Sequence, residues 1–148
     1  MRSRTRGPQR KKLHKLLAAA IVLFVWAPIA SGAEGLRVEL NKLEPMESAC
    51  RAYLLFENGT SGDFSSLKLD LVMFNPEGVI NRRLAVEGGP LPSGKTSVKL
   101  FDIEGVSCGS VDRVLLNGVL ACRDAQGERN DCLTLIETGS RSSADFFK

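Results

Sequence analysis

Apolar and polar residues alternate along much of this chain, and the alternation is clearest from Leu67 to Phe74. Apolar side chains occupy every second position there, and Lys68 and Asp70 lie between them. The apolar positions are Leu67, Leu69, Leu71 and Met73. Because successive side chains of a β-strand point to opposite faces of a sheet, this stretch predicts a strand with one buried face, for which the later segments serve as partners.

Five further stretches have the composition of short strands. Turn residues bound them, and Asn75-Pro76-Glu77-Gly78 has the residues that a type I turn accepts most easily. In the stretch 51–57 apolar side chains fall on both faces, which predicts burial on both. The predicted strands cover Leu36 to near Pro45, 51–57, 79–86, 96–101 and 133–137.

Residues 111–121 are also apolar on both faces, and three interpretations stay open for them. A single central strand fits their length and their β-branched residues. Two short strands fit Asn117-Gly118, which is a strong signal for a two-residue hairpin. A helix is the third interpretation, although the β-branched residues and Gly118 count against it.

Seven short strands separated by turns, with no convincing helix, predict an all-β fold. The expected architecture is an immunoglobulin-like antiparallel β-sandwich. We expect this domain to cover residues 34–138 and to be followed by a flexible C-terminal tail at 139–148.

The first 33 residues have the composition of a cleavable signal peptide. Seven basic residues and no acidic residue precede an uncharged apolar run from Leu16 to Ala30, and Ser31-Gly32-Ala33 supplies small residues at the cleavage site. The apolar run would span only about 22 Å of a bilayer core that is about 30 Å thick. We therefore expect cleavage after Ala33, export, and no stable membrane anchor afterwards.

Removal of this leader reverses the sign of the net charge. The full chain carries 20 Lys and Arg against 17 Asp and Glu, whereas 13 basic and 17 acidic residues remain after residue 33, a net charge of −4. The remaining chain has no basic stripe, and Arg82-Arg83 is expected on a solvated strand face. Nucleic acid is therefore not an expected partner.

The cysteines Cys50, Cys108, Cys122 and Cys132 all follow the leader. Their even number in a small exported chain predicts two disulfides. A four-cysteine zinc site is the alternative, but no two of them have the short spacing of a zinc knuckle. If successive strands alternate in direction, Cys50 and Cys108 share one end of the sandwich and the other two share the opposite end. We favour the pairs Cys50–Cys108 and Cys122–Cys132, because a Cys108–Cys122 bond would join the two ends of one extended strand.

Two short motifs match functional patterns by their letters. Gly89 to Thr96 fits the nucleotide-binding pattern G-x-x-x-x-G-K-T. Pro90 and Pro92 remove two backbone N–H donors, and the residues after Thr96 alternate like a strand, so we interpret the motif as a loop that leads into a strand. Asn58-Gly59-Thr60 is formally a glycosylation sequon.

Groups that could catalyse a reaction are few. The single histidine, His14, lies in the leader, so the remaining chain has no imidazole for nucleophilic catalysis or metal binding. Paired carboxylates suffice for glycoside hydrolysis, but no spacing singles out a pair, and a calcium site is only weakly indicated by the acids between the last two cysteines. We expect no catalytic residue, no metal and no cofactor. The acids considered are Asp70, Glu77, Glu87, Asp102 and Glu104, and for calcium Asp124, Glu128 and Asp131.

Residues 48–58 and 67–80 resemble, in their order of strands and turns, the small bacterial envelope β-sandwiches typified by FxLYD domains. Val72-Met73-Phe74-Asn75 stands where the Phe-x-Leu-Tyr-Asp signature would be. The chain after the leader resembles, over its whole length, an uncharacterised family of small exported proteobacterial proteins that are described only by their signal sequence. That resemblance implies a periplasmic location and transfers no catalytic residues.

The sparse catalytic groups favour a non-enzymatic interaction module that binds another envelope protein. Val72, Phe74 and Phe101 are apolar at strand positions expected to face outward, so these residues or an exposed sheet edge are the expected binding surface. The alternatives are a carboxylate-dependent, carbohydrate-active enzyme and a small-ligand carrier. A carrier needs a cavity between the sheets, whereas a chain of this length is expected to fill its core.

Overall fold

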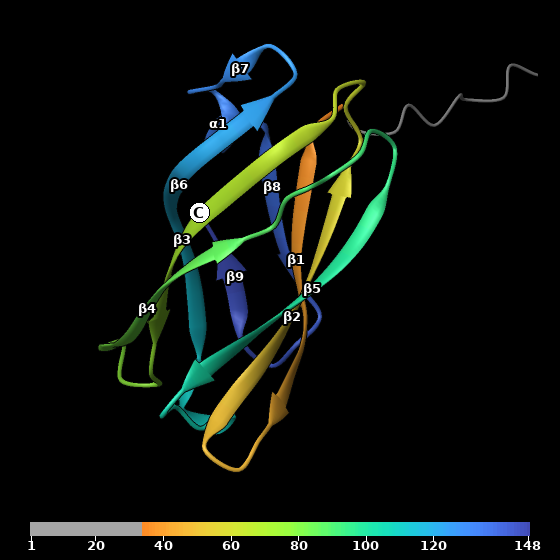
Figure 1. Cartoon of the computed structure of the whole chain (residues 1–148). Coiled ribbons are helices and arrows are strands. Elements are labelled where there is room, and N and C mark those ends of the chain that lie inside the picture. The colour runs from red at the N-terminus through yellow and green to blue at the C-terminus, as the bar shows by residue number, and fades with distance from the viewer. Residues whose placement is uncertain (1–33) are drawn as a thin grey trace, which may run out of the picture. The chain divides into compact units, whose positions relative to one another are not determined.

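The computed structural model describes residues 34–148, which form two β-sheets packed face to face (Figure 1). Sheet A has the strand order β5-β2-β1-β8, and sheet B has the order β4-β3-β6-β7, with β9 also paired to β6. Within residues 34–148 no helix has the length and apolar content needed to cross a membrane. The predicted signal peptide, residues 1–33, lies outside the described residues. The elements are β1 (Leu36–Pro45), β2 (Ala49–Asn58), β3 (Phe64–Phe74), β4 (Ile80–Glu87), β5 (Thr96–Glu104), η1 (Cys108–Ser110), β6 (Arg113–Asp124), β7 (Gly127–Glu128), α1 (Cys132–Leu135), β8 (Ile136–Ser140) and β9 (Asp145–Phe147).

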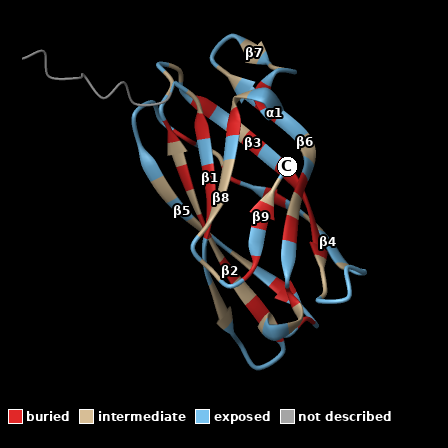
Figure 2. Ribbon diagram, turned by 180° about the vertical axis from the view of Figure 1, so that it is seen from behind, coloured by how far each residue is buried: buried red, intermediate tan, exposed pale blue. Residues whose placement is uncertain are grey.

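The core lies between the two sheets, and buried residues alternate with more exposed ones along the strands (Figure 2). The predicted buried face of β3 is confirmed, because each of its four residues is at most 2% exposed. Sheet A supplies the opposite layer, which includes Val38, Leu54 and Phe56. The all-β sandwich that the sequence predicts is therefore the observed fold. The four buried β3 residues are Leu67, Leu69, Leu71 and Met73.

The strand count and the directions differ from the prediction. The described part of the chain has nine strands instead of about seven, and two pairs run parallel: β8 with β1, and β9 with β6. After β7 the chain leaves sheet B, passes through α1 and enters sheet A beside β1. A tight hairpin forces antiparallel pairing, whereas a connection between two sheets imposes no such direction.

Residues 113–124 form one strand, β6, which excludes the hairpin and helix alternatives. Asn117 and Gly118 lie inside the strand, and Gly118 is opposite Asp70 of β3. The ladder between β3 and β6 runs from Phe74–Arg113 to Phe64–Asp124, and three register irregularities take up the local mismatch. Because β3 provides a partner along this whole length, the turn signal at Asn117-Gly118 is overridden by tertiary pairing.

Both predicted disulfides are confirmed. Cys50–Cys108 links β2 to η1 across a Cα separation of 4.9 Å, and Cys122–Cys132 links β6 to α1 across 6.5 Å. The first bond therefore joins the start of β2 to the connection that leads from β5 to β6. The second holds the turn between β6 and α1, which encloses β7.

The last ten residues are not a tail outside the sandwich, so the predicted domain boundary at residue 138 is wrong. β8 continues to Ser140, and β9 then pairs with β6. Phe146 is 3% exposed and belongs to the core, and the Lys148 ammonium donates to the carbonyl of Ile136. A polar stretch before these residues suggested a tail, but its serines close a tight turn: the Ser140 hydroxyl donates to the Ala144 carbonyl at 2.6 Å.

Replacement of Phe146 by alanine tests whether β9 belongs to the folded unit. The substitution empties a buried site, so we expect the free energy of unfolding in urea to fall by about 3 kcal/mol. Phe147→Ala, at a half-buried neighbouring position, is the matched control and should cost less than half as much. Equal stability of Phe146→Ala and the unmodified protein would show that the C-terminal strand does not contribute to the core.

Candidate functional site

Four large side chains form a compact apolar group on the outer face of sheet A. We call Tyr53, Leu55, Val98 and Leu100 the apolar block. Tyr53 of β2 pairs with Leu100 of β5, and Leu55 pairs with Val98, so the four occupy adjacent positions on one face. Val98 is 53% exposed and Leu100 is 48% exposed, whereas the two β2 residues are half-buried. The apolar block therefore presents apolar surface to solvent beside the edge strand β5 of sheet A.

The alternation along β5 is opposite to the predicted one. Phe101 was expected to face outward, but it lies opposite Ala52 and packs against the core. Ile103, two positions further along, is 1% exposed and lies opposite Cys50. Both faces of this strand carry apolar residues, and a shift of its pairing register by one residue would exchange the buried face with the exposed one. The sequence signal that favours the observed choice is Ile103, which extends the Phe101 face beyond the predicted strand end.

Charged pairs surround the apolar block. The Arg51 guanidinium donates to both Asp102 carboxylate oxygens at 2.7 and 2.9 Å. The Lys42 ammonium donates to Glu44 at 2.6 Å, and the Tyr53 hydroxyl donates to the same carboxylate at 2.6 Å. That hydrogen bond raises the pKa of Tyr53 and lowers that of Glu44, where the Lys42 ammonium is the larger cause. An apolar centre with a rim of paired charges is the usual layout of a protein interface.

β5 is the last strand of sheet A, and its outer backbone edge faces no other strand of that sheet. Its pairing with β2 is continuous, and the Lys95 carbonyl and the Gly105 N–H both bond to the β2 side. In an antiparallel ladder every second residue bonds to a given neighbour, so the odd-numbered residues of β5 face β2. The even-numbered residues Val98, Leu100 and Asp102 direct their N–H and C=O groups away from the sheet.

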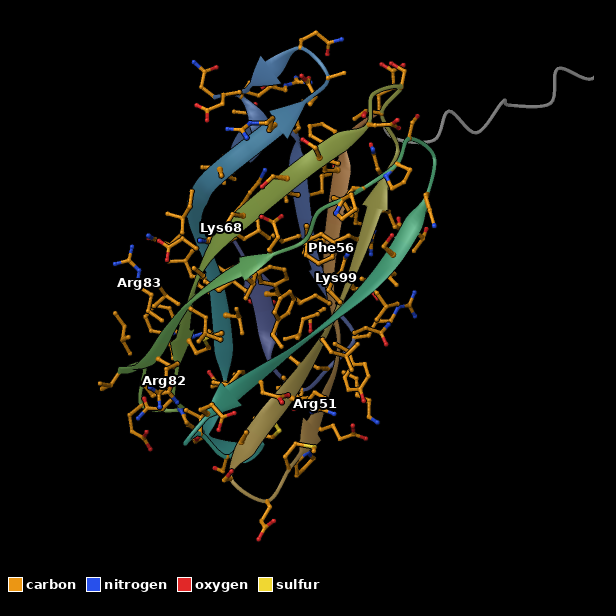
Figure 3. All side chains as sticks on the ribbon, in the orientation of Figure 1. Arg51, Phe56, Lys68, Arg82, Arg83 and Lys99 are labelled. Carbon is orange, nitrogen blue, oxygen red and sulfur yellow. A yellow bond between two sulfur atoms is a disulfide. The ribbon has the colours of Figure 1, made fainter. Side chains whose placement is uncertain are left out.

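Two long cations connect β5 to sheet B along this side of the sandwich (Figure 3). The Arg82 guanidinium of β4 donates to the Glu104 carbonyl at 2.6 Å, and the Lys99 ammonium donates to the Gly89 carbonyl at 3.3 Å. An apolar hollow in the core, lined by Leu84 and Phe101 among others, has a volume of about 10 Å³. That is room for about one water molecule.

The other predicted binding residues lie on the outer face of sheet B. Val72 is 6% exposed, between its β4 and β6 neighbours. Phe74 is half-buried, with its ring centroid 6.5 Å from that of Phe147 and 5.4 Å from the Arg113 guanidinium. The structure therefore brings Val72 and Phe74 together on β3 and places Phe101 in the other sheet. The predicted joint surface of Phe74 and Phe101 does not exist.

Three candidate carboxylates are held by structural partners. Asp70, 4% exposed, accepts both Arg83 hydrogen bonds at 2.7 Å and one from the Asn117 amide at 2.6 Å, and these bonds lower its pKa. The Arg51 guanidinium lowers the pKa of Asp102. Although burial raises the pKa of Glu87, hydrogen bonds from the N–H groups at positions 67 and 89 and from a serine hydroxyl give a net lowering. A catalytic general acid needs a raised pKa, which is the opposite direction.

The motifs singled out in the sequence have structural roles. Asn58 is 1% exposed, and its side-chain amide donates to the carbonyls of Gly62 and Leu91. Gly94, with φ of 67°, closes the loop before β5, and its N–H donates to the Asn58 carbonyl. The segment that resembles a nucleotide-binding motif thus leads into a strand, as predicted.

The acids between the last two cysteines pair with arginines. Arg129 donates to Asp124 and Asp131, and Arg123 donates to Glu128 at 2.7 Å. Over residues 34–148 no group of three or more metal-ligating side chains is close enough to hold an ion.

Asp70→Asn tests whether the ionised, buried carboxylate of Asp70 stabilises the fold. The pKa of Asp70 lies below its ordinary value of 3.8 in the folded protein. Its ionised form therefore stabilises the fold above that pH, and this contribution is lost as the pH falls below it. We expect the substitution to cost about 2 kcal/mol in urea unfolding at pH 7 and much less at pH 3. Asp112→Asn is the control, because Asp112 forms only an exposed ion pair of 3.6 Å. A cost that does not change with pH would contradict this role.

Hydrogen exchange of the β5 amides tests whether the outer backbone edge of this strand is unpaired. We expect the N–H groups of Val98, Leu100 and Asp102 to exchange at least about 100-fold faster than those of Lys99 and Phe101, because only the latter donate to β2. NMR exchange rates give both sets in one sample, so each set controls the other. Equal protection of both sets would show that the edge is already covered.

Comparison with known proteins supports the fold and does not assign an activity. No protein-family model matches the chain, and no curated protein matches its sequence. Among solved structures, that of IrmA from Escherichia coli superposes with a TM-score of 0.56 and 12% sequence identity, over 70% of this chain and 90% of IrmA. The chain is thus similar to IrmA in its β-sandwich fold.

Proposed function

We propose that the protein is a non-enzymatic interaction module of the bacterial envelope, which is exported to the periplasm and binds another envelope protein through the apolar block. The observation that carries the proposal is the exposure of Val98 and Leu100 beside Tyr53, at the free edge of sheet A. A contiguous apolar patch with a polar rim on a small domain is typical of an interaction site. Tyrosine and arginine, which dominate interface energetics, are both present there as Tyr53 and Arg51.

Export is supported by the leader-like composition of residues 1–33 and by the two disulfides. Disulfides persist in oxidising compartments such as the periplasm. The resemblance to small exported proteobacterial proteins points to the same location. Under this proposal the mature chain begins at Glu34.

The two alternatives have less support. A carboxylate-dependent enzyme requires a carboxyl group that stays protonated near neutral pH, and Asp70, Glu87 and Asp102 all have lowered pKa values. A carrier that holds its ligand between the sheets requires a pocket of several hundred Å³ there, and the apolar hollow between the sheets has about 10 Å³.

Leu100→Glu tests the proposed surface. The mature protein, immobilised and exposed to an envelope extract, should retain a partner that mass spectrometry identifies. We expect Leu100→Glu to reduce its recovery about tenfold, because a charge is introduced at the centre of the contact. Ile80→Glu is the matched control, since Ile80 is 60% exposed on the other sheet, and it should leave recovery unchanged. Equal recovery with both variants would rule out the apolar block as the binding surface.

A further inference from the structure

The free edge of β5 combines three features that define a particular kind of partner: unpaired backbone groups, apolar side chains on one side, and cations on the other. We propose that β5 binds an extended segment of another protein as an added strand, whose outer side chains are apolar and whose inner side chains are acidic. This inference rests on the proposed interaction function and specifies the chemistry of the partner.

The backbone of β5 offers a template for a further strand. Val98, Leu100 and Asp102 direct N–H and C=O groups away from β2, and the register of this strand pair contains no bulge. An added strand that bonds to these groups extends sheet A, which is the common mode of strand addition to a sheet edge. The Glu104 carbonyl already accepts a hydrogen bond from Arg82, so the free stretch runs from Thr96 to Asp102.

The outer face selects apolar side chains. Side chains of an added strand continue the alternation of β5, so its residues opposite Val98 and Leu100 would lie beside the apolar block. Tyr53 and Leu55 then form the second row of the same apolar surface. Cross-strand apolar pairs of this kind stabilise a ladder.

The inner side selects acidic side chains. Lys99 lies in the middle of the free stretch and Arg82 contacts β5 just beyond its end, and each donates only to a neutral carbonyl, of Gly89 and of Glu104 respectively. Within the described part of the chain neither of them forms an ion pair with a carboxylate. Carboxylates on the inner side of an added strand would supply these cations with charged partners, and opposite charges across a strand pair are favourable.

A second copy of this chain does not provide that chemistry. The inner side of β5 carries Ser97, Lys99, Phe101 and Ile103, which include no carboxylate. Pairing of two β5 strands would bring one Lys99 close to the other, to Ser97 or to an apolar residue, and in none of these cases to a carboxylate. An inward-pointing lysine also discourages unwanted edge pairing, so the edge would reject uncharged strands and accept acidic ones.

Two synthetic peptides test the proposal on the mature protein. Both are as long as β5, nine residues, and alternate valine with glutamate in one and with lysine in the other. We expect the glutamate peptide to bind about tenfold more tightly than the lysine peptide in NMR titrations. On binding it should slow amide exchange at Val98 and Leu100 while leaving Lys99, which already bonds to β2, unchanged.

Charge-reversed variants give the complementary measurement. Lys99→Glu should invert the preference between the two peptides. Arg82→Glu, at an exposed position, should weaken the binding of the glutamate peptide, and it keeps the test available if Lys99→Glu does not fold. Lys68→Glu, on the outer face of sheet B, is the matched control and should preserve the preference. Equal affinity for both peptides, or no change in amide exchange at Val98 and Leu100, overturns the proposal.

The outcome is separable from that of the proposed function. If neither peptide binds while Leu100→Glu still abolishes partner recovery, strand addition is overturned and the interaction function stands. If the glutamate peptide binds with the expected protection while Leu100→Glu leaves partner recovery unchanged, strand addition stands and the apolar block is not the surface for that envelope partner.

Discussion

The continuous pairing of β2 with β5 decides which side chains this protein presents to its surroundings. The register runs without a bulge from Ala49–Glu104 to Glu57–Thr96, and its inner residues pack into the core, where Ile103 is opposite the disulfide-bonded Cys50. Once those residues are inside, Val98 and Leu100 must lie outside, because neighbouring residues of a strand point to opposite faces. The apolar block is thus a consequence of how the core is filled.

The two sides of the sandwich are not equivalent. On one side a short turn of the chain joins β8 to β9 and so connects the layers, whereas on the other side the longer loop 88–95 joins β4 to β5. On the other side β4 and β5 end their sheets, and the side-chain hydrogen bonds of Arg82 and Lys99 link them. Both sides have edge strands, and the apolar block lies on the β4 and β5 side.

The buried carboxylates on the two outer faces are each matched by arginine side chains. Asp70 is almost fully buried on the outer face of sheet B and is compensated by Arg83 and Asn117, since an unpaired charge at such a site would be costly. Glu39 has a similar place on sheet A, where Arg37 and Arg141 donate to it. These carboxylates hold side chains of neighbouring strands and turns together. Lys99 and Arg82 differ from them, because their acceptors are neutral carbonyls.

The sequence by itself determined the strand with Leu67 and Leu71 at its buried face, the all-β class and the two disulfide pairs. The alternation of Leu67, Leu69, Leu71 and Met73 is a local signal, and the cysteine pairs follow from the expected directions of the strands that carry them. Tertiary structure alone decided the face of β5, the continuity of β6 through Gly118 and the inclusion of Phe146 in the core. In each of these cases the local sequence is compatible with two arrangements, and the choice depends on pairing and burial against residues far away in the chain.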